Sequence, residues 1–138
     1  MSADSSWDVQ TGVFTHLTAA GALTALLADG AGSILDHVPA GTAFPYLVIG
    51  ETSARPLDGH AASGNEIMLT LHTYSRASGM QQARSIMAAV YTALHEADFT
   101  VPNQALALCR CIGSEAALEA DGLTRHGIQH FRIITEPV

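Results

Sequence analysis

Apolar and polar residues alternate from residue 66 to residue 76, in the stretch EIMLTLHTYSR. Because successive side chains of a β-strand point to opposite faces, this alternation predicts a strand with one apolar face. Ile67, Leu69 and Leu71 form that face, and we expect them in the core. The opposite face could belong to an active site, a partner surface or a solvated sheet face. It carries Met68, Thr70, His72, Tyr74 and Arg76.

Two amphipathic stripes precede this strand. Val13, Phe14 and Leu17 recur at helical spacing, which predicts a helix from about residue 7 to residue 20. Leucines at positions 23, 26 and 27 predict a short helical turn that ends near Ala28. We expect both pieces to cover one face of a sheet.

A third helix is predicted after the strand, beginning at a capping box formed by Ser78 and Gln81. One stripe of this helix is apolar or aromatic along its length, so we expect it to be the main helix of the core. The stripe consists of Met80, Ala83, Ile86, Met87, Val90, Tyr91 and Leu94. Its methionines are expected to fill gaps in the core rather than to bind a ligand.

Four further strands are predicted from apolar or alternating runs between turn residues. They cover residues 34–38, 46–57, 105–116 and 123–135. Pro45 precedes the second of these, where its missing N–H does little harm. Residues 58–65 are rich in Gly, Ala, Ser and Asn, and they predict a hairpin loop before the strand at residues 66–76.

The predicted order is one helical region, three strands, a helix and two strands. Consecutive strands joined by hairpins imply an antiparallel sheet of about five strands with helices packed on one face. The sequence therefore predicts an α+β fold. Its length is that of a single domain covering residues 1–138.

Composition favours a subunit of an assembly. Apolar residues make up 48% of the chain and charged residues only 14%, against about 25% charged in ordinary soluble domains. This shortfall of charged residues is typical of a chain that buries surface against neighbouring subunits, with a well-packed monomer as the alternative.

The charge balance argues against a nucleic-acid-binding surface, because the formal charge is −7, with six Arg and no Lys. No apolar run approaches the roughly 20 residues that span a bilayer, so we expect a cytoplasmic protein without membrane contact.

The residue types that usually carry catalysis or metal binding show no matching pattern. The chain has no Gly-x-Ser-x-Gly turn, and no Lys for Schiff-base or phosphate-loop chemistry. Cys109 and Cys111 supply at most half of a tetrahedral zinc site, and we expect them to be small core residues. His126 and His130 would lie roughly 13 Å apart on one strand, too far to share a metal. We therefore expect no catalytic residue, no metal and no cofactor.

Four stretches of the chain match one protein family in their order and spacing. They are HVPAGTAFPYLVIGE, LTLHTYSRASG, AAVYTALHEA and DGLTRHGIQHFRII. Together with the leading LTALLADG they cover most of the chain, and they resemble the phage tail terminators, including those encoded in gene transfer agent clusters. The resemblance implies a structural protein. It would form a ring, usually of six subunits, that ends polymerisation of the tail tube and joins the tail to the head.

The same resemblance implies the partners. Each subunit would contact its neighbours in the ring, a tail tube protein on one side and a head–tail connector or stopper protein on the other. DNA would pass through the lumen, and a negatively charged lumen would repel its phosphates. The protein would be assembled in the bacterial cytoplasm and would end at the tail–head junction of a virion or virion-like particle.

The second face of the strand at residues 66–76 would then meet a neighbouring subunit or line the lumen. We assign that role to Met68, His72, Tyr74 and Arg76, because Met, Tyr and Arg are enriched in interfaces. The alternative is that another helix or loop of the same chain covers this face. The following hairpin residues would project toward the tube or an adjacent subunit: Arg55, Asp58, His60 and Asn65.

Two other functions stay open. One is a head-completion or connector ring, although connector proteins of this size are often more helical than five predicted strands allow. The other belongs to a different class, a small α+β ligand-binding domain or enzyme, which would need a concave pocket with convergent polar groups.

Overall fold

The computed structural model describes residues 5–58 and 63–138, so the predicted contact of His60 lies outside the described residues. The helices are α1 (Ser6–Thr18), α2 (Gly21–Thr24), the 3-10 helix η1 (Gly30–Ser33) and α3 (Gln81–Leu94). The strands are β1 (Ile34–Leu35), β2 (Tyr46–Asp58), β3 (Ser63–Ser75), β4 (Gln104–Leu118) and β5 (Arg125–Pro137). No helix among these residues is long and apolar enough to cross a membrane.

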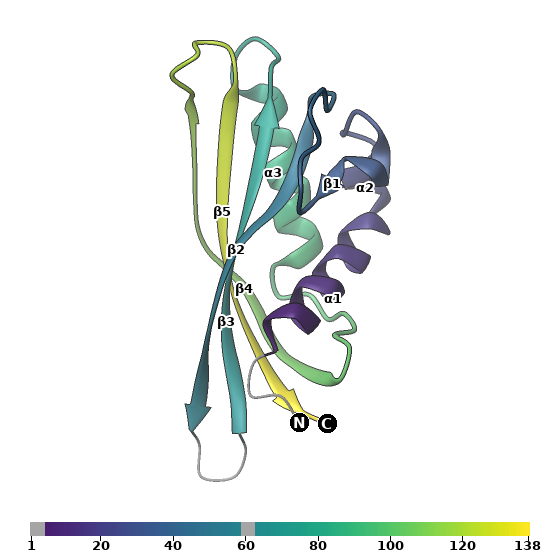
Figure 1. The fold of residues 1–138 in the computed structure, drawn as a ribbon, viewed down its shortest axis with the longest axis vertical. Helices are drawn as coiled ribbons and strands as arrows, with labels where there is room; N and C mark the ends of the chain where they lie inside the picture. The colour runs from purple at the N-terminus through teal and green to yellow at the C-terminus, as the bar shows by residue number, and fades with distance from the viewer. Residues whose placement is uncertain (1–4, 59–62) are drawn as a thin grey trace.

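The five strands form one sheet in the order β1-β2-β3-β5-β4. All neighbouring strands are antiparallel except β1 and β2, which are parallel. Helices α1, α2 and α3 lie together on one side of this twisted sheet (Figure 1). The predicted α+β class and the order of helices and strands are therefore confirmed.

The core lies between the helices and the facing side of the sheet. Ile67, Leu69 and Leu71 of β3 are almost completely buried there, as the alternation in the sequence predicted. Other fully buried side chains are Val9, Val13, Leu17, Leu23, Leu47, Ile86, Leu94, Phe131 and Ile133. Cys109 is buried, and burial raises the pKa of its thiol to about 12. Cys111 is half-buried, and both cysteines are free thiols.

Two predicted element boundaries are wrong. The strand expected at residues 34–38 has only two residues, because only Ile34 and Leu35 reach β2. The capping box of Ser78 and Gln81 does not form, since α3 begins at Gln81 and its N-cap makes no side-chain hydrogen bond. Gly79 lies between them with φ +77°, a conformation that turns the chain away from a helical path.

The buried stripe of α3 is narrower than the sequence predicted. Ala83, Ile86, Met87, Val90 and Leu94 are buried, and Met80 is half-buried. Tyr91 is 44% exposed instead, and its ring stacks on His95 with centroids 4.4 Å apart.

Gly12 allows α1 to pack closely against the chain that follows α3. A Cβ atom at Gly12 would lie 2.7 Å from the Thr100 carbonyl oxygen and 3.1 Å from the Val101 Cα. Both atoms belong to the backbone, so neither can move aside as a flexible side chain would. Glycine is therefore required here by space, although it lowers helix propensity.

We expect Gly12→Ala to lower the free energy of unfolding by about 1–3 kcal/mol, because the overpacked methyl group must displace backbone. Gly21→Ala is the matched control, since a Cβ at Gly21 would meet nothing within 4 Å. That control should stay within about 0.5 kcal/mol of the wild type. Urea unfolding followed by circular dichroism measures both, and equal stability of the two variants would contradict this packing.

Candidate functional site

The sheet face opposite the helices carries the residues that the sequence singled out. No described helix lies over this face (Figure 1). Met68, His72 and Tyr74 are half-buried on it, and Arg76 is exposed at its end. The loop before β2 reaches one edge, where Phe44 packs against Tyr46.

Five rings form a continuous row on this open face: Phe44, Tyr46, Tyr74, His126 and His72. The distances between successive ring centroids are 4.9, 5.2, 4.5 and 4.9 Å. Strand register explains the row, because Tyr46 lies opposite Tyr74 and Tyr74 lies opposite His126. Directly opposed aromatic side chains stabilise neighbouring strands. We call these five residues the ring row.

Arg76 closes one end of the ring row. Its guanidinium carbon lies 4.3 Å from the centroid of the Phe44 ring, within the range of a cation–π contact. Its Nε donates a hydrogen bond of 3.1 Å to the Thr124 hydroxyl. Arg76 follows directly after β3, and two other segments hold its side chain: the loop before β2 and the turn before β5.

The two histidines of the ring row are bonded to each other, with one carboxylate bonded to His72 and a second near His126. His72 Nε2 lies 2.6 Å from Glu51 Oε1, and His72 Nδ1 lies 2.7 Å from His126 Nε2. Because the carboxylate of Glu51 can only accept, neutral His72 carries its proton on Nε2. His72 Nδ1 then accepts from His126 Nε2, which leaves His126 Nδ1 facing Glu119 at 3.8 Å. We call Glu51, His72, His126 and Glu119 the histidine chain.

The surroundings of the histidine chain shift the pKa values of two of its members, His126 and Glu51. Burial, followed by the nearby His72, lowers the pKa of His126, although Glu119, Glu51 and Glu115 act in the opposite direction. The pKa of Glu51 is lowered, first by a backbone hydrogen bond and then by the bond from His72. Desolvation raises the pKa of Tyr74, which keeps its hydroxyl neutral.

Gly50 makes room for the histidine chain. A Cβ atom at Gly50 would lie 2.6 Å from His72 Cδ2 and 2.8 Å from His72 Nε2. The strand register shifts between Ile49 and Thr52, which marks a β-bulge at this point. The glycine and the bulge together let the imidazole of His72 come close to the β2 backbone and reach Glu51.

Sequence reasoning treated His72 and His126 as unrelated residues. They meet because β3 pairs with β5, which places His126 opposite Tyr74 and diagonal to His72. His130 is a separate case, since its Nδ1 lies 3.1 Å from the Thr70 hydroxyl. Among the described residues, no group of three or more His, Cys, Asp or Glu side chains could hold a metal ion.

A second polar cluster lies toward the hairpin between β2 and β3. Glu66 is only 6% exposed, and its carboxylate accepts from Arg132 Nε and from Arg55 Nε, the latter at 2.7 Å. The bond from Arg132 is the main reason that the pKa of Glu66 is lowered, with Arg55 contributing further. The Arg55 side chain stays 70% exposed, so it remains available for another contact.

Asn65 and Asp58, which were also predicted to project from the hairpin, differ from Arg55 in their placement. Asn65 is 8% exposed in β3, where it lies between Pro56 of β2 and Thr135 of β5. Its side chain therefore does not project from the hairpin. Asp58 is the last residue of β2, and its side chain is outside what the structure describes.

Charges of both signs share the open face. Glu66 pairs with Arg55 and Arg132, and Glu51 and Glu119 flank the histidines. Arg110, on β4 opposite Arg132, reaches back over the sheet edge to Glu96, with Nη2 and Oε2 2.9 Å apart. The net charge of −7 is therefore not concentrated on this face.

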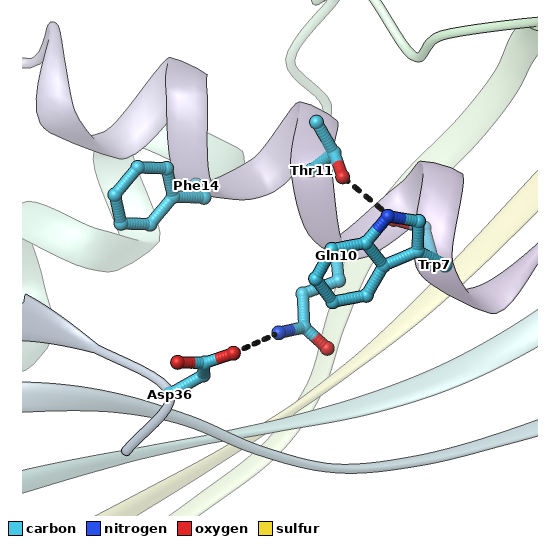
Figure 2. Close-up of a pocket in the computed structure, with 5 residues that line it drawn as sticks. All are labelled: Trp7, Gln10, Thr11, Phe14 and Asp36. Carbon is cyan, nitrogen blue, oxygen red and sulfur yellow. Dashed lines mark hydrogen bonds between the residues drawn. The ribbon is translucent and has the colours of Figure 1, made fainter. Parts of the chain in front are cut away.

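A shallow hollow lies on the opposite side of the molecule, on the outer surface of α1 (Figure 2). It has a volume of about 270 Å³ and is lined by Trp7, Gln10, Thr11, Phe14 and Asp36. Its polar side chains are already paired, because Gln10 Nε2 donates to Asp36 and the Thr11 hydroxyl donates to the Trp7 carbonyl. The hollow therefore lacks the free convergent polar groups that a small-molecule site needs.

Comparison with known proteins gives a consistent result. Residues 11–136 match the family described as "Tail completion protein gp17". The tail completion protein gp17 of Bacillus phage SPP1 is 30% identical over 93 residues, which are 64% of this chain and 66% of that protein. The match thus spans just under two thirds of the relative's length. A chain from the virion of a native gene transfer agent particle has a similar fold, with a TM-score of 0.83 and 23% identity. That similarity covers 93% of this chain and 94% of the other.

The histidine chain should make stability depend on pH. The pKa of His126 in the folded protein lies below its ordinary value of 6.5, so the unfolded chain binds this proton more readily. Stability contributed by neutral His126 should therefore be lost as the pH falls below the ordinary value of 6.5 and through the lowered pKa of the folded protein. In His126→Gln, the decline over that range should be smaller, while the amide can still donate to His72. Urea midpoints at several pH values test this. His37→Gln, at an exposed histidine, should keep the wild-type dependence, and an unchanged decline in His126→Gln would contradict the prediction.

Proposed function

Because the chain belongs to the tail completion protein gp17 family, we propose that it forms a ring that caps the tail tube and joins it to the head. The family membership confirms the resemblance drawn from the sequence, and it assigns the chain to structural tail completion rather than to an enzyme class. The proposed ring has six subunits, ends polymerisation of the tube and lets DNA pass through its lumen. The protein would act at the tail–head junction of a virion or virion-like particle.

The open face of the sheet is the observation that carries this proposal. A closed ring is head-to-tail, so each subunit needs two different patches, one for each neighbour. Met68, the ring row and Arg76 together offer aromatic, methionine and arginine side chains with no Lys, which is the composition that interface cores favour. We propose that this face meets a neighbouring subunit or lines the lumen.

The balanced charges of the open face suit either position. Of its exposed arginines, Arg55 is bonded to Glu66 and Arg110 is bonded to Glu96, whereas Arg76 lies over the Phe44 ring. Arginines that are already paired with carboxylates release few counterions from DNA, so their attraction for it is weak. A lumen with this surface would let DNA slide. The sequence-based expectation of a negatively charged lumen is therefore replaced by a proposal of a nearly neutral one.

The hairpin between β2 and β3 suggests how the ring meets the tube. Both strands run to one end of the elongated molecule, beyond α1 (Figure 1). The exposed side chain of Arg55 lies on this hairpin. We propose that this end contacts the tail tube protein and that the opposite end, with the turn between β4 and β5, faces the connector or stopper protein.

Replacing Tyr74 tests the role of the open face. We expect Tyr74→Asp to stay monomeric, because a carboxylate would have to be desolvated when this face is covered. Tyr74→Phe keeps the ring row and should assemble like the wild type. Light scattering and electron microscopy of each protein, alone and mixed with tail tubes, measure assembly. Wild-type protein should give rings, or an extra layer at one tube end.

Folding must be separated from assembly in this test. Circular dichroism and thermal unfolding should show a folded Tyr74→Asp monomer. Met68→Glu, at a half-buried residue of the same face, is a second variant if Tyr74→Asp unfolds. Normal rings from a folded variant of either kind would exclude this face from the interface. Wild-type protein indifferent to tubes would overturn the proposed role itself.

A further inference from the structure

Strand β4 is an edge of the sheet, and its two halves differ. In the half near α3, the backbone groups that point away from β5 are bonded within the chain. Glu96 N donates to the Cys109 carbonyl at 2.8 Å, and Cys111 N donates to His95 Nδ1 at 3.1 Å. The segment after α3 therefore covers this half of the edge, as natural proteins commonly do with exposed strand edges.

The other half of β4 has no such cover. A register shift between Cys111 and Gly113 inserts one extra residue into the strand. Because Cys111 points its N–H away from β5, the extra residue makes Ser114 and Ala116 the next residues to do so. No described residue makes a hydrogen bond to the outward backbone groups of residues 114–118.

The uncovered half also lacks the residues that usually protect an edge. Residues 112–118 read IGSEAAL, with one charge and neither Pro nor Lys. Ile112 is 48% exposed and Leu118 is 47% exposed. A long, mostly uncharged and exposed edge is a template for pairing with another strand.

The sheet has a second free edge, on β2. Strand β1 pairs only with Leu47 and Val48, so residues 50–58 of β2 pair with no described strand on that side. Pro56 carries no N–H and cannot donate to another strand. The part of this edge that keeps all its donors therefore ends at Arg55, and we take residues 52–55 as the segment that can pair. These four residues can all pair within the five residues 114–118.

We propose that the edge of β4 at residues 114–118 binds the edge of β2 at residues 52–55 of a second copy of this chain. Pairing of two different edges is head-to-tail, which lets a ring close, whereas pairing of β4 with β4 would stop at a two-fold dimer. Charge complementarity supports the β2 edge as the partner of the β4 edge. Arg55 is 70% exposed on the β2 edge, and Glu115 is exposed on the β4 edge.

This inference rests on the proposed ring and names the contact between its subunits. It requires that the two edges meet through main-chain hydrogen bonds, with side chains of the open face pairing across the junction. Arg55 points to that face, since it bonds to Glu66 together with Arg132. Glu115 lies opposite Ile128 of β5, two residues along from His126 and His130.

Ala116→Pro tests the edge directly. It removes an N–H that points away from β5, so the monomer loses no hydrogen bond, whereas the ring loses one at every junction. We expect a folded monomer whose ring formation is at least tenfold weaker by light scattering. Ala116→Thr keeps the N–H and should form rings like the wild type. If Ala116→Pro unfolds, Ser114→Pro makes the same test two residues earlier.

Rings formed by folded Ala116→Pro and Ser114→Pro at the wild-type concentration would overturn the inference and leave the proposed function intact. Absence of rings from wild-type protein, even with tail tubes, would overturn the proposed function instead.

Hydrogen exchange of the wild-type protein tests whether the strand that binds the β4 edge is β2 of a second copy. On ring formation, amide exchange should slow both at residues 114–118 and at residues 52–55. Slowing at residues 114–118 alone would mean that a strand other than β2 binds there, and it would overturn this assignment.

Discussion

The pairing of β3 with β5 sets both faces of the sheet. Leu69 lies opposite Phe131 and Ile67 lies opposite Ile133, and these four side chains are buried beneath the helices. Their neighbours along each strand point the other way and build the open face. Because side chains alternate with a period of two, a slip of one residue would expose the apolar set and bury the polar one. Burial of the apolar set therefore also fixes the ring row.

The helices cover only one face of the sheet, and this determines what the other face must be. Helices occupy one face of the sheet, so the other face must be compatible with water in the free subunit. It achieves this through polar groups that bond to one another, such as Glu51, His72 and His126. The same side chains have apolar ring surfaces that a partner could cover. A surface of this kind suits a protein that is first a subunit and then part of an assembly.

The sequence predicted the fold well where local spacing carries the information. The buried residues of β3, the stripe of α3 and the order of elements follow from periods of two and of about 3.6 residues. Boundaries were less predictable. Gly79 and its positive φ delay the start of α3, and the shortness of β1 depends on how far β2 extends beside it. The placement of the candidate site was predicted in part, since Met68, His72, Tyr74 and Arg76 share one face and Asn65 is buried, while their role in an interface stays a prediction.

The sequence alone determined most of the residues that face the core, which protein family the chain resembles, and which residues stand on the second face of β3. Those properties are local, because each depends on residue type and spacing within one element. Only the tertiary structure decided that His126 joins His72, that Arg132 and Arg55 share Glu66, and that half of β4 is uncovered. These contacts join residues far apart in the chain. They follow from strand order and register, which are selected by the free energy of the whole core rather than by any single segment.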